Sequence, residues 1–214
     1  MKPLFITGIG TGVGKTLVAA LVAAALKADY WKPVQAGTDE GTDTETVANW
    51  LGGFAGKFHQ EVYKLKLPAS PHLAAAEEGL RIDLDEIARR LPATGNNLVI
   101  EGAGGLFVPL NEKEFVCDLI KKLDAQVILV SRNYLGSINH SLLTAAVCRE
   151  QGLSVLGWIF NDDYMQYEEE IARWSNYPVI AKLPHLAAIT PETIHDQASR
   201  LKEGLNRLIQ KNSV

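Results

Sequence analysis

The 214-residue sequence has few cysteines and no long apolar run. Cys117 and Cys148 lie far apart in apolar, helix-like stretches and form no C-x-x-C pair, so we expect two buried free thiols in a reducing, cytoplasmic compartment. The apolar stretch 17–26 is too short to span a bilayer and indicates a buried helix. The first residues, KPLFITGIG, also lack the apolar length and cleavage site of a secretion signal.

A strong excess of charge of one sign is also missing. The sequence has 21 Lys and Arg against 25 Asp and Glu, a formal net charge of -4, with no basic run or acidic tail. This balance gives no support for a nucleic acid or an anionic membrane as partner. Hydrophobic residues make up 47% of the chain, and we expect a single globular domain over residues 1–214.

Short apolar runs alternate with longer helical stretches along the chain. This alternation predicts an α/β fold of three layers, in which helices cover both faces of a mainly parallel central sheet. Thr190 before Pro191 is a good N-cap for the last helix. The irregular stretch Gly52–Gly79 is predicted to hold an extra strand, Val62–Leu67, and a helix, Pro71–Glu78. The other predicted strands are Leu4–Thr7, Tyr30–Val34, Leu98–Glu101, Val127–Ser131, Val155–Phe160 and Val179–Lys182, and the other helices are Lys15–Lys27, Thr44–Leu51, Leu84–Leu91, Cys117–Leu123, Asn139–Glu150, Tyr167–Trp174 and Pro191–Gln210.

A glycine-rich loop, FITGIGTGVGKT, follows the first predicted strand and opens the first helix. Its backbone N–H groups and the helix N-terminus form a nest for phosphate oxygens, Lys15 would reach the β- and γ-phosphates, and the Thr16 hydroxyl would hold Mg²⁺. The strict pattern G-x-x-x-x-G-K-[ST] requires glycine at position 9, which is isoleucine, and Gly8 lies one residue further out. The motif nevertheless predicts a P-loop NTPase-like enzyme that uses ATP and Mg²⁺.

Two further charged positions follow strands. Lys32 lies inside an apolar strand, where burial is costly unless the ammonium meets an anion such as a γ-phosphate or a substrate carboxylate; the alternative is a lysine that snorkels to solvent. Asp43 precedes a helix, and from its position alone an N-cap is a better interpretation than a Mg²⁺ ligand.

Glu101 ends the strand Leu98–Glu101 and is followed by the small residues Gly102, Ala103, Gly104 and Gly105. This placement is typical of the acidic residue that helps to position Mg²⁺ in phosphate-loop enzymes. The tight GAGG turn also allows a ligand to approach the backbone closely.

Together these blocks resemble the dethiobiotin synthetase family, over nearly the whole chain. The resemblance rests on TGIGTGVGKT, WKPVQAG followed by Asp43, EGAGGLFVPL and LGSINHSLLT, with GWIFND and LPHL later. The extra residue in the phosphate loop is itself a feature of this family. The resemblance implies that 7,8-diaminopelargonic acid takes up CO₂ on one amine, that ATP phosphorylates the carbamate, and that the second amine closes a cyclic urea, with ADP and phosphate released.

The resemblance also implies roles for individual residues. Lys15, Lys32 and Thr11 would act on the carbamate and phosphates, and Thr16, Asp43 and Glu101 would form the Mg²⁺ shell. Asn161 would read the adenine edge, although a simple turn after the strand is the alternative. The full predicted nucleotide set is Gly12, Val13, Gly14, Lys15, Thr16, Leu17, Asp43, Glu101, Gly102, Ala103, Gly104, Asn161, Asp162, Pro184, His185, Leu186 and Glu192.

The predicted substrate set is Lys32, Ala36, Leu135, Gly136 and Asn139. Backbone N–H groups between Leu135 and Asn139 would receive the carboxylate tail. The family takes this loop from a partner subunit, which implies a homodimer. The family also usually places Ser or Thr at the position of Ala36, so the hydrogen bond from that hydroxyl to the diamine is absent here, or water or Thr38 replaces it.

Two other functions compete with this interpretation. A partition ATPase of the Par or Min type shares the fold but carries a second lysine five residues before the GK lysine, where this chain has Gly10. A small-molecule kinase would lack the pairing of Lys32 with EGAGG and would leave a phosphorylated product.

Overall fold

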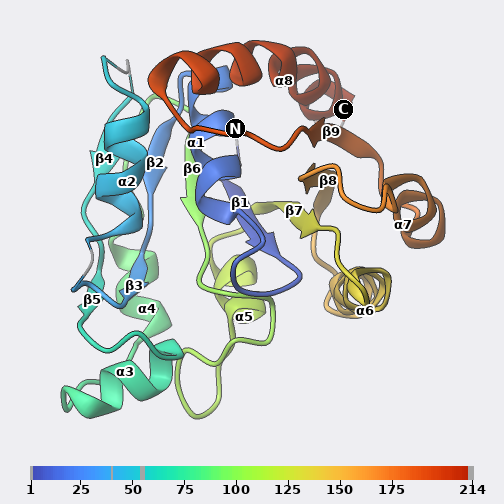
Figure 1. Ribbon diagram of the computed structural model, residues 1–214. Coiled ribbons are helices and arrows are strands. Elements are labelled where there is room, and N and C mark those ends of the chain that lie inside the picture. The colour runs from blue at the N-terminus through green and yellow to red at the C-terminus, as the bar shows by residue number, and fades with distance from the viewer. Residues whose placement is uncertain (1, 40, 54–55, 212–214) are drawn as a thin grey trace.

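The computed structural model describes residues 2–39, 41–53 and 56–211, which fold around a seven-stranded sheet (Figure 1). The strand order is β4-β2-β6-β1-β7-β8-β9, and every neighbouring pair is parallel. A smaller parallel pair, β3 and β5, lies beside it. The strands are β1 Leu4–Gly8, β2 Asp29–Trp31, β3 Val34–Ala36, β4 Phe58–His59, β5 Tyr63–Leu65, β6 Leu98–Glu101, β7 Gln126–Arg132, β8 Val155–Asn161 and β9 Val179–Leu183.

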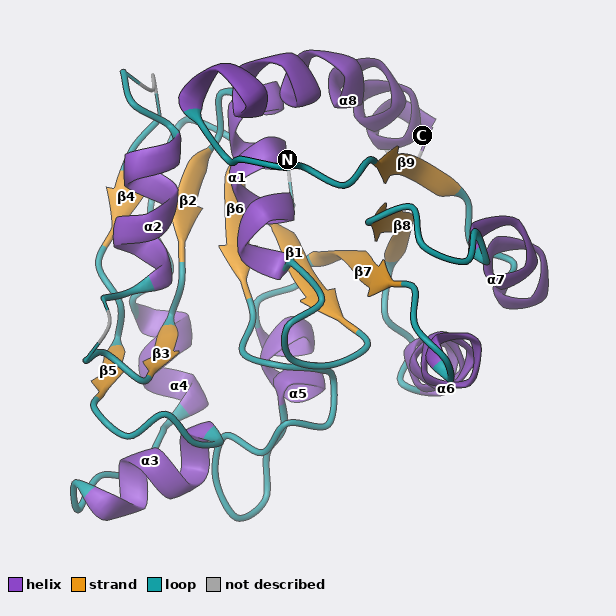
Figure 2. Cartoon of the chain, viewed as in Figure 1, coloured by secondary structure: helices purple, strands orange, loops and turns teal. Residues whose placement is uncertain are grey.

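Helices cover both faces of the sheet, so the predicted three-layer architecture is confirmed (Figure 2). Helix α1 packs against α2 and α8 on one face, whereas α4 packs against α5 and α6 against α7 on the other. Within the described part of the chain no helix is long and apolar enough to cross a bilayer. The helices are α1 Lys15–Leu26, α2 Asp43–Trp50, α3 Pro71–Glu77, α4 Leu84–Arg89, α5 Val116–Lys122, α6 Ser137–Glu150, α7 Glu168–Ser175 and α8 Pro191–Lys211.

Strand β1 shows why the strands read as continuous apolar runs. Leu4 and Ile6 belong to the core cluster on the α1 side, and Phe5 between them belongs to the cluster on the other side. Successive side chains of a strand point to opposite faces, so both faces of β1 are buried. The strand therefore delivers the loop that follows it from the centre of the sheet.

One predicted strand is wrong in a way that matters for function. The run Tyr30–Val34 is broken at Lys32 and Pro33: β2 ends at Trp31, and β3 begins at Val34 in the smaller sheet. Proline has no N–H to continue the ladder, and its carbonyl instead accepts hydrogen bonds from the N–H groups of Val62 and Tyr63 at 2.9 and 3.0 Å. The break leaves Lys32 at the carboxyl edge of the main sheet.

The remaining predicted elements are present with small shifts at their ends. The extra strand and helix in the irregular stretch are β5 and α3, whereas the two-residue strand β4 was not predicted because it is too short to form an apolar run. Thr190 caps α8, since its hydroxyl accepts the N–H of Thr193 at 3.3 Å. Cys117 and Cys148 are buried free thiols as expected.

At the start of β2, the carboxylate of Asp29 holds this strand in place. Asp29 is fully buried, and its oxygens accept the N–H of Lys57 at 3.0 Å, the amide of Asn96 at 2.9 Å and the ring nitrogen of His59 at 2.8 Å. Burial by itself raises the pKa of Asp29, but the hydrogen bonds from Asn96, His59 and Lys57 outweigh it and lower the pKa to about 2. Asp29 thus joins β2 to β4 and to the turn before β6.

We therefore predict that Asp29→Ala lowers the free energy of unfolding by about 1–3 kcal/mol, because three donors lose a buried acceptor. Urea unfolding followed by circular dichroism measures the change. Asp196→Ala, which removes a carboxylate from an exposed pair with Arg200, is the control and should shift stability by less than about 0.5 kcal/mol. Equal effects of the two substitutions would contradict the structural role given to Asp29.

Candidate active site

The phosphate loop runs from Gly8 to Thr16 between β1 and α1. Gly12 and Gly14 have φ values of 74° and 94°, which glycine adopts without strain. Lys15 is the first residue of α1, and its ammonium donates to the carbonyl of Gly10 at 2.8 Å. The loop is therefore closed on itself by the lysine that was predicted to reach the phosphates.

Gly14 also allows β8 to approach the loop. A Cβ at this position would lie 2.1 Å from the side-chain nitrogen of Asn161, the last residue of β8. That nitrogen donates to the carbonyl of Val13 at 3.0 Å. Asn161 is thus more than a residue of the turn after the strand, because it fastens the phosphate loop to the sheet. Its role as the reader of adenine stays a prediction.

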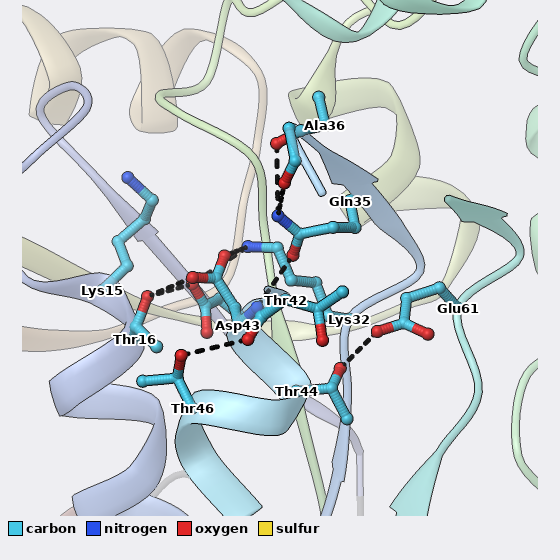
Figure 3. Close-up of polar contacts among 12 residues, drawn as sticks. Lys15, Thr16, Lys32, Gln35, Ala36, Thr42, Asp43, Thr44, Thr46 and Glu61 are labelled. Carbon is cyan, nitrogen blue, oxygen red and sulfur yellow. Dashed lines mark hydrogen bonds and ion pairs between the residues drawn. The ribbon is translucent and has the colours of Figure 1, made fainter. Parts of the chain in front are cut away.

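Lys32 is buried between two carboxylates, with 4% of its surface exposed. Its ammonium lies 2.5 Å from Asp43 Oδ2 (Figure 3). It also lies 3.0 Å from Glu101 Oε1. The alternative of a snorkelling lysine is wrong, and the anions that Lys32 meets are protein carboxylates. Burial by itself lowers the pKa of Lys32, but Glu101 and Asp43 outweigh it and raise the pKa. The ammonium therefore stays charged at neutral pH.

Asp43 faces the phosphate loop and does not cap its own helix. Thr42 is the N-cap of α2 and forms a capping box with Glu45, so the N-cap interpretation of Asp43 is wrong. The backbone N–H of Asp43 donates to the side-chain oxygen of Gln35 at 3.1 Å. This bond fixes the start of α2 against β3 and leaves the Asp43 carboxylate free to point toward Thr16 and Lys32 (Figure 3).

Thr16, Asp43 and Glu101 converge as predicted. The Thr16 hydroxyl lies 2.9 Å from Glu101 Oε1 and 3.2 Å from Asp43 Oδ1. A hydroxyl and two carboxylates are oxygen donors of the kind that Mg²⁺ prefers, and Mg²⁺ usually takes its remaining ligands from phosphates and water. Among the described residues no group of three or more His, Cys, Asp and Glu could hold a metal by itself. The donors present fit a magnesium ion that is bound together with a nucleotide.

Two residues at this site were not predicted from the sequence. Tyr30 is fully buried on β2, and its hydroxyl donates to Glu101 Oε2 at 2.8 Å. Burial and the charge of Glu101 raise the pKa of Tyr30 well above its usual value, so the phenol stays neutral. Gln35 also donates to the carbonyls of Ala36 and Gly37, both at 3.2 Å. In the sequence, Gln35 stands out only as a polar residue inside an apolar run, and Tyr30 does not differ from any aromatic residue of a buried strand.

The side chains of Lys15, Thr16, Lys32, Gln35, Asp43 and Glu101 line a cavity of about 720 Å³. The phosphate loop, Lys32 and Ala36 border it, together with Gly102, Ala103 and Gly104, so the nucleotide and substrate positions predicted there share one space. The segment 68–71, which was not predicted to contribute, forms another wall. The cavity therefore has phosphate-binding groups on one side and room for a second ligand beside them.

The later members of the predicted nucleotide set, from Asp162 to Glu192, lie elsewhere and are only partly brought together. Asp162 and His185 line a second hollow with Thr11, Gly12 and Val13, and Asp162 pairs with Arg132 at 2.9 Å. Glu192 lines a separate hollow with Gly52 and His195 at the start of α8. The structure does not bring Glu192 beside Asp162. Pro184 and Leu186 flank His185, and Leu17 is buried in α1.

The predicted substrate-tail residues form an exposed corner. Leu135 precedes α6 and is 86% exposed, Gly136 has a φ of 103°, and Asn139 lies in the first turn of α6. None of the three borders the 720 Å³ cavity. In this single chain they are not brought to the other predicted substrate residues, Lys32 and Ala36.

Comparison with known proteins decides the family. A family model described as an AAA domain matches residues 2–193. The ATP-dependent dethiobiotin synthetase BioD of Cytophaga hutchinsonii is 47% identical over 203 residues, which cover 94% of this chain and 97% of that protein. The same-named protein of Christiangramia forsetii is 43% identical, covering 95% of this chain and 98% of its own. The chain belongs to the dethiobiotin synthetase family.

Solved structures add the fold. The chain matches MinD in the MinC:MinD cell division complex of Aquifex aeolicus with a TM-score of 0.62 and 13% identity, covering 98% of this chain and 96% of that one. A ParA family ATPase from Chlorobium tepidum gives a TM-score of 0.57 at 14% identity, with 98% and 99% covered. Such low identity shows a common fold alone, so these matches do not favour a partition function for this member of the dethiobiotin synthetase family.

The affinity for ADP is expected to depend on pH through the environment of Lys15. Lys15 is 8% exposed, and burial lowers its pKa to about 8, although Glu101 and Asp43 act in the opposite direction. The charged form, which binds phosphate, is lost as the pH rises through that value. We expect ADP affinity, measured by calorimetry, to fall about 10-fold from pH 7 to pH 9.

Lys15→Arg is the matched control, because arginine stays charged over this range. Whatever the absolute affinity of that variant, it should stay level between pH 7 and pH 9. A level profile for the wild-type protein would contradict the lowered pKa of Lys15.

Proposed function

We propose that this protein closes the ureido ring of dethiobiotin from 7,8-diaminopelargonic acid, CO₂ and ATP, with ADP and phosphate as the other products. The observation that carries the proposal is the convergence of Lys15, Lys32, Thr16, Asp43 and Glu101 on one cavity. Family membership supports the choice of substrate, since relatives of near-equal length carry this activity in their names.

The chemistry builds negative charge at one place. An amine nitrogen of the diamine adds to CO₂ and loses a proton, and the carbamate oxygen then attacks the γ-phosphorus while ADP leaves. The second amine attacks the carbamoyl carbon and loses a proton, the ring closes and phosphate leaves. When bound, Mg²⁺ neutralises charge on the phosphate oxygens. The protein must stabilise anionic species throughout this sequence.

The residues around the cavity suit that task. Lys15 leaves the carbonyl of Gly10 to meet phosphate oxygens, and Lys32 presents its charge from the β2 side. Two cations held in place before the reaction lower the energy of an anionic transition state without reorganisation. Thr16, Asp43 and Glu101 would hold the magnesium ion, and Ala36 leaves an apolar wall beside the diamine. Thr11 lies between the two hollows and can donate to a phosphate.

The decisive experiment supplies purified protein with diaminopelargonate, bicarbonate, ATP and Mg²⁺, and follows dethiobiotin by mass spectrometry and free phosphate by a colorimetric assay. We expect both products in equal amounts, and ATP turnover that depends on the diamine. A stable phosphorylated substrate would indicate a small-molecule kinase. ATP hydrolysis that is indifferent to the diamine would indicate a switch ATPase.

For the reaction itself we predict that Lys32→Ala lowers turnover by about 100-fold or more, as for other preorganised charge donors. Steady-state assays at saturating ATP and diamine measure the loss, and circular dichroism verifies that the variant is folded. Lys122→Ala, which removes an exposed lysine paired with Asp85, should keep wild-type turnover. Unchanged turnover in Lys32→Ala would remove this residue from the catalytic set.

We also propose that the protein acts as a homodimer, with the corner around Leu135 and Gly136 completing the partner's substrate site. Three apolar side chains are exposed near this corner: Tyr134 at 36%, Leu135 at 86% and Leu143 at 57%. Exposed apolar patches of this kind are typical of association surfaces. The corner also lies outside the cavity of its own chain, which supports a contribution in trans.

Leu135→Asp should therefore shift the protein toward monomer in sedimentation velocity, because a charge replaces the most exposed apolar side chain of the corner. The variant should also raise the KM for the diamine while ADP affinity stays unchanged. Trp174→Asp, on the exposed side of α7, is the control for adding a charge elsewhere. A monomeric wild-type protein with full activity would refute the proposal.

Residues 1–214 are proposed to act as one domain in the cytoplasm. Two buried thiols, Cys117 and Cys148, suit a reducing compartment, and burial raises the pKa of Cys148 to about 12. The small-molecule substrates and the net charge of -4 call for no nucleic acid or membrane partner.

A further inference from the structure

Tyr30 and Glu101 face each other across two neighbouring strands. Strands β2 and β6 lie side by side (Figure 1), with Tyr30 paired to Val99 and Trp31 to Ile100. Side chains two residues apart share a face of the sheet, so Tyr30 and Lys32 on one chain segment project toward the side of Val99 and Glu101 on the other. The Tyr30 phenol therefore lies in the core, next to the ion pair of Lys32 and Glu101.

The two oxygens of Glu101 have separate environments. Oε1 accepts from the Thr16 hydroxyl at 2.9 Å and from the Lys32 ammonium at 3.0 Å, so it faces the cavity. Oε2 accepts from the Tyr30 hydroxyl at 2.8 Å inside the core. The Glu101 carboxylate is 1% exposed, and its orientation is determined by a donor on each side.

Asp43, the other predicted metal ligand, is held differently. Its side chain is 33% exposed, and within the described part of the chain its side-chain oxygens meet Thr16 and Lys32, which are both groups of the cavity. Glu101 alone has a neutral donor from the core behind it. The pair thus combines one carboxylate that is fixed from behind with one that can adjust to its ligand.

We propose that Tyr30 is a positioning residue for the nucleotide-bound magnesium: its phenol fixes Glu101 so that a single oxygen, Oε1, is presented to the ion. The inference rests on the proposed function, because it assumes that Mg²⁺ binds with the nucleotide beside Thr16. Tyr30 suits the role because its ring is wholly buried and packs at 6.1 Å from the ring of Phe58, which leaves the hydroxyl little freedom.

Partners that orient a metal ligand from behind typically change metal affinity by about 10- to 100-fold when removed. The readout is therefore the dissociation constant of ADP in EDTA divided by that in Mg²⁺, both measured by calorimetry. This ratio isolates the contribution of the metal and needs no catalysis. In Tyr30→Phe we expect this ratio to fall about 10-fold, while ADP affinity in EDTA stays at the wild-type value.

Tyr63→Phe is the matched control. The hydroxyl of Tyr63 accepts the N–H of Asp83 at 2.9 Å, so this variant also loses one partly buried hydrogen bond, but remote from Glu101. Its ratio should equal that of the wild-type protein. Glu101→Gln tests whether Tyr30 acts through Glu101. If it does, the double variant Tyr30→Phe with Glu101→Gln has the same ratio as Glu101→Gln alone.

The outcomes separate the inference from the function on which it rests. A wild-type ratio near one would show that Mg²⁺ does not bind with the nucleotide, which refutes the proposed metal role. A strong wild-type ratio that is unchanged in Tyr30→Phe, or an equal loss in Tyr63→Phe, overturns the positioning role alone. If Tyr30→Phe does not fold, recovery of folding in the double variant with Glu101→Gln supports the link between phenol and carboxylate, and failure to recover overturns it.

Discussion

The site depends on one buried ion pair network, in which the Lys32 ammonium lies between Asp43 and Glu101. An isolated charge in the interior costs several kcal/mol, and removal of one partner from a buried pair is strongly destabilising. The surrounding elements must therefore end where these three groups can meet. Strand β2 ends at Trp31, directly before Lys32 and Pro33, Thr42 rather than Asp43 caps α2, and β6 ends at Glu101.

The network also explains why the site can be held ready without a ligand. Lys15 and Lys32 supply two positive charges, and Asp43 and Glu101 supply two negative charges, so the buried charges balance before any nucleotide arrives. A nucleotide that binds together with magnesium would offer these oxygen donors and ammonium groups partners of opposite charge. Lys32 is paired with both carboxylates, whereas Lys15 donates to the carbonyl of Gly10, so phosphate oxygens would give Lys15 an anionic partner.

Local sequence patterns predicted most of the elements and, together with the family resemblance, the candidate residues, but not how these residues are paired. The loop between β1 and α1, the capping of α8 by Thr190 and the carboxylate at the end of β6 all follow from short-range rules. The pairing of Lys32 with Glu101 does not follow from such rules, because Glu101 lies 69 positions further along the chain and the sequence does not reveal the register between β2 and β6. Tyr30 was missed for the same reason: on a buried strand it resembles any aromatic core residue until the neighbouring strand is known. Glu192 was grouped with Asp162 by resemblance, and the structure places it in a different hollow.

The fold shared with MinD and a ParA family ATPase does not by itself indicate an activity, so the function must be argued from the side chains of the site. Gly10 occupies the position where a partition ATPase carries its second lysine, and a Cβ there would meet nothing within 4 Å. Packing therefore does not require glycine at this position. In this chain the second cation comes from Lys32 on the β2 side, within the 720 Å³ cavity. A lysine at position 10 would add charge to the phosphates from the loop, whereas Lys32 adds it where a second substrate can lie beside them. Lys15 and Lys32 thus border one cavity that has room for a second ligand beside the phosphate loop.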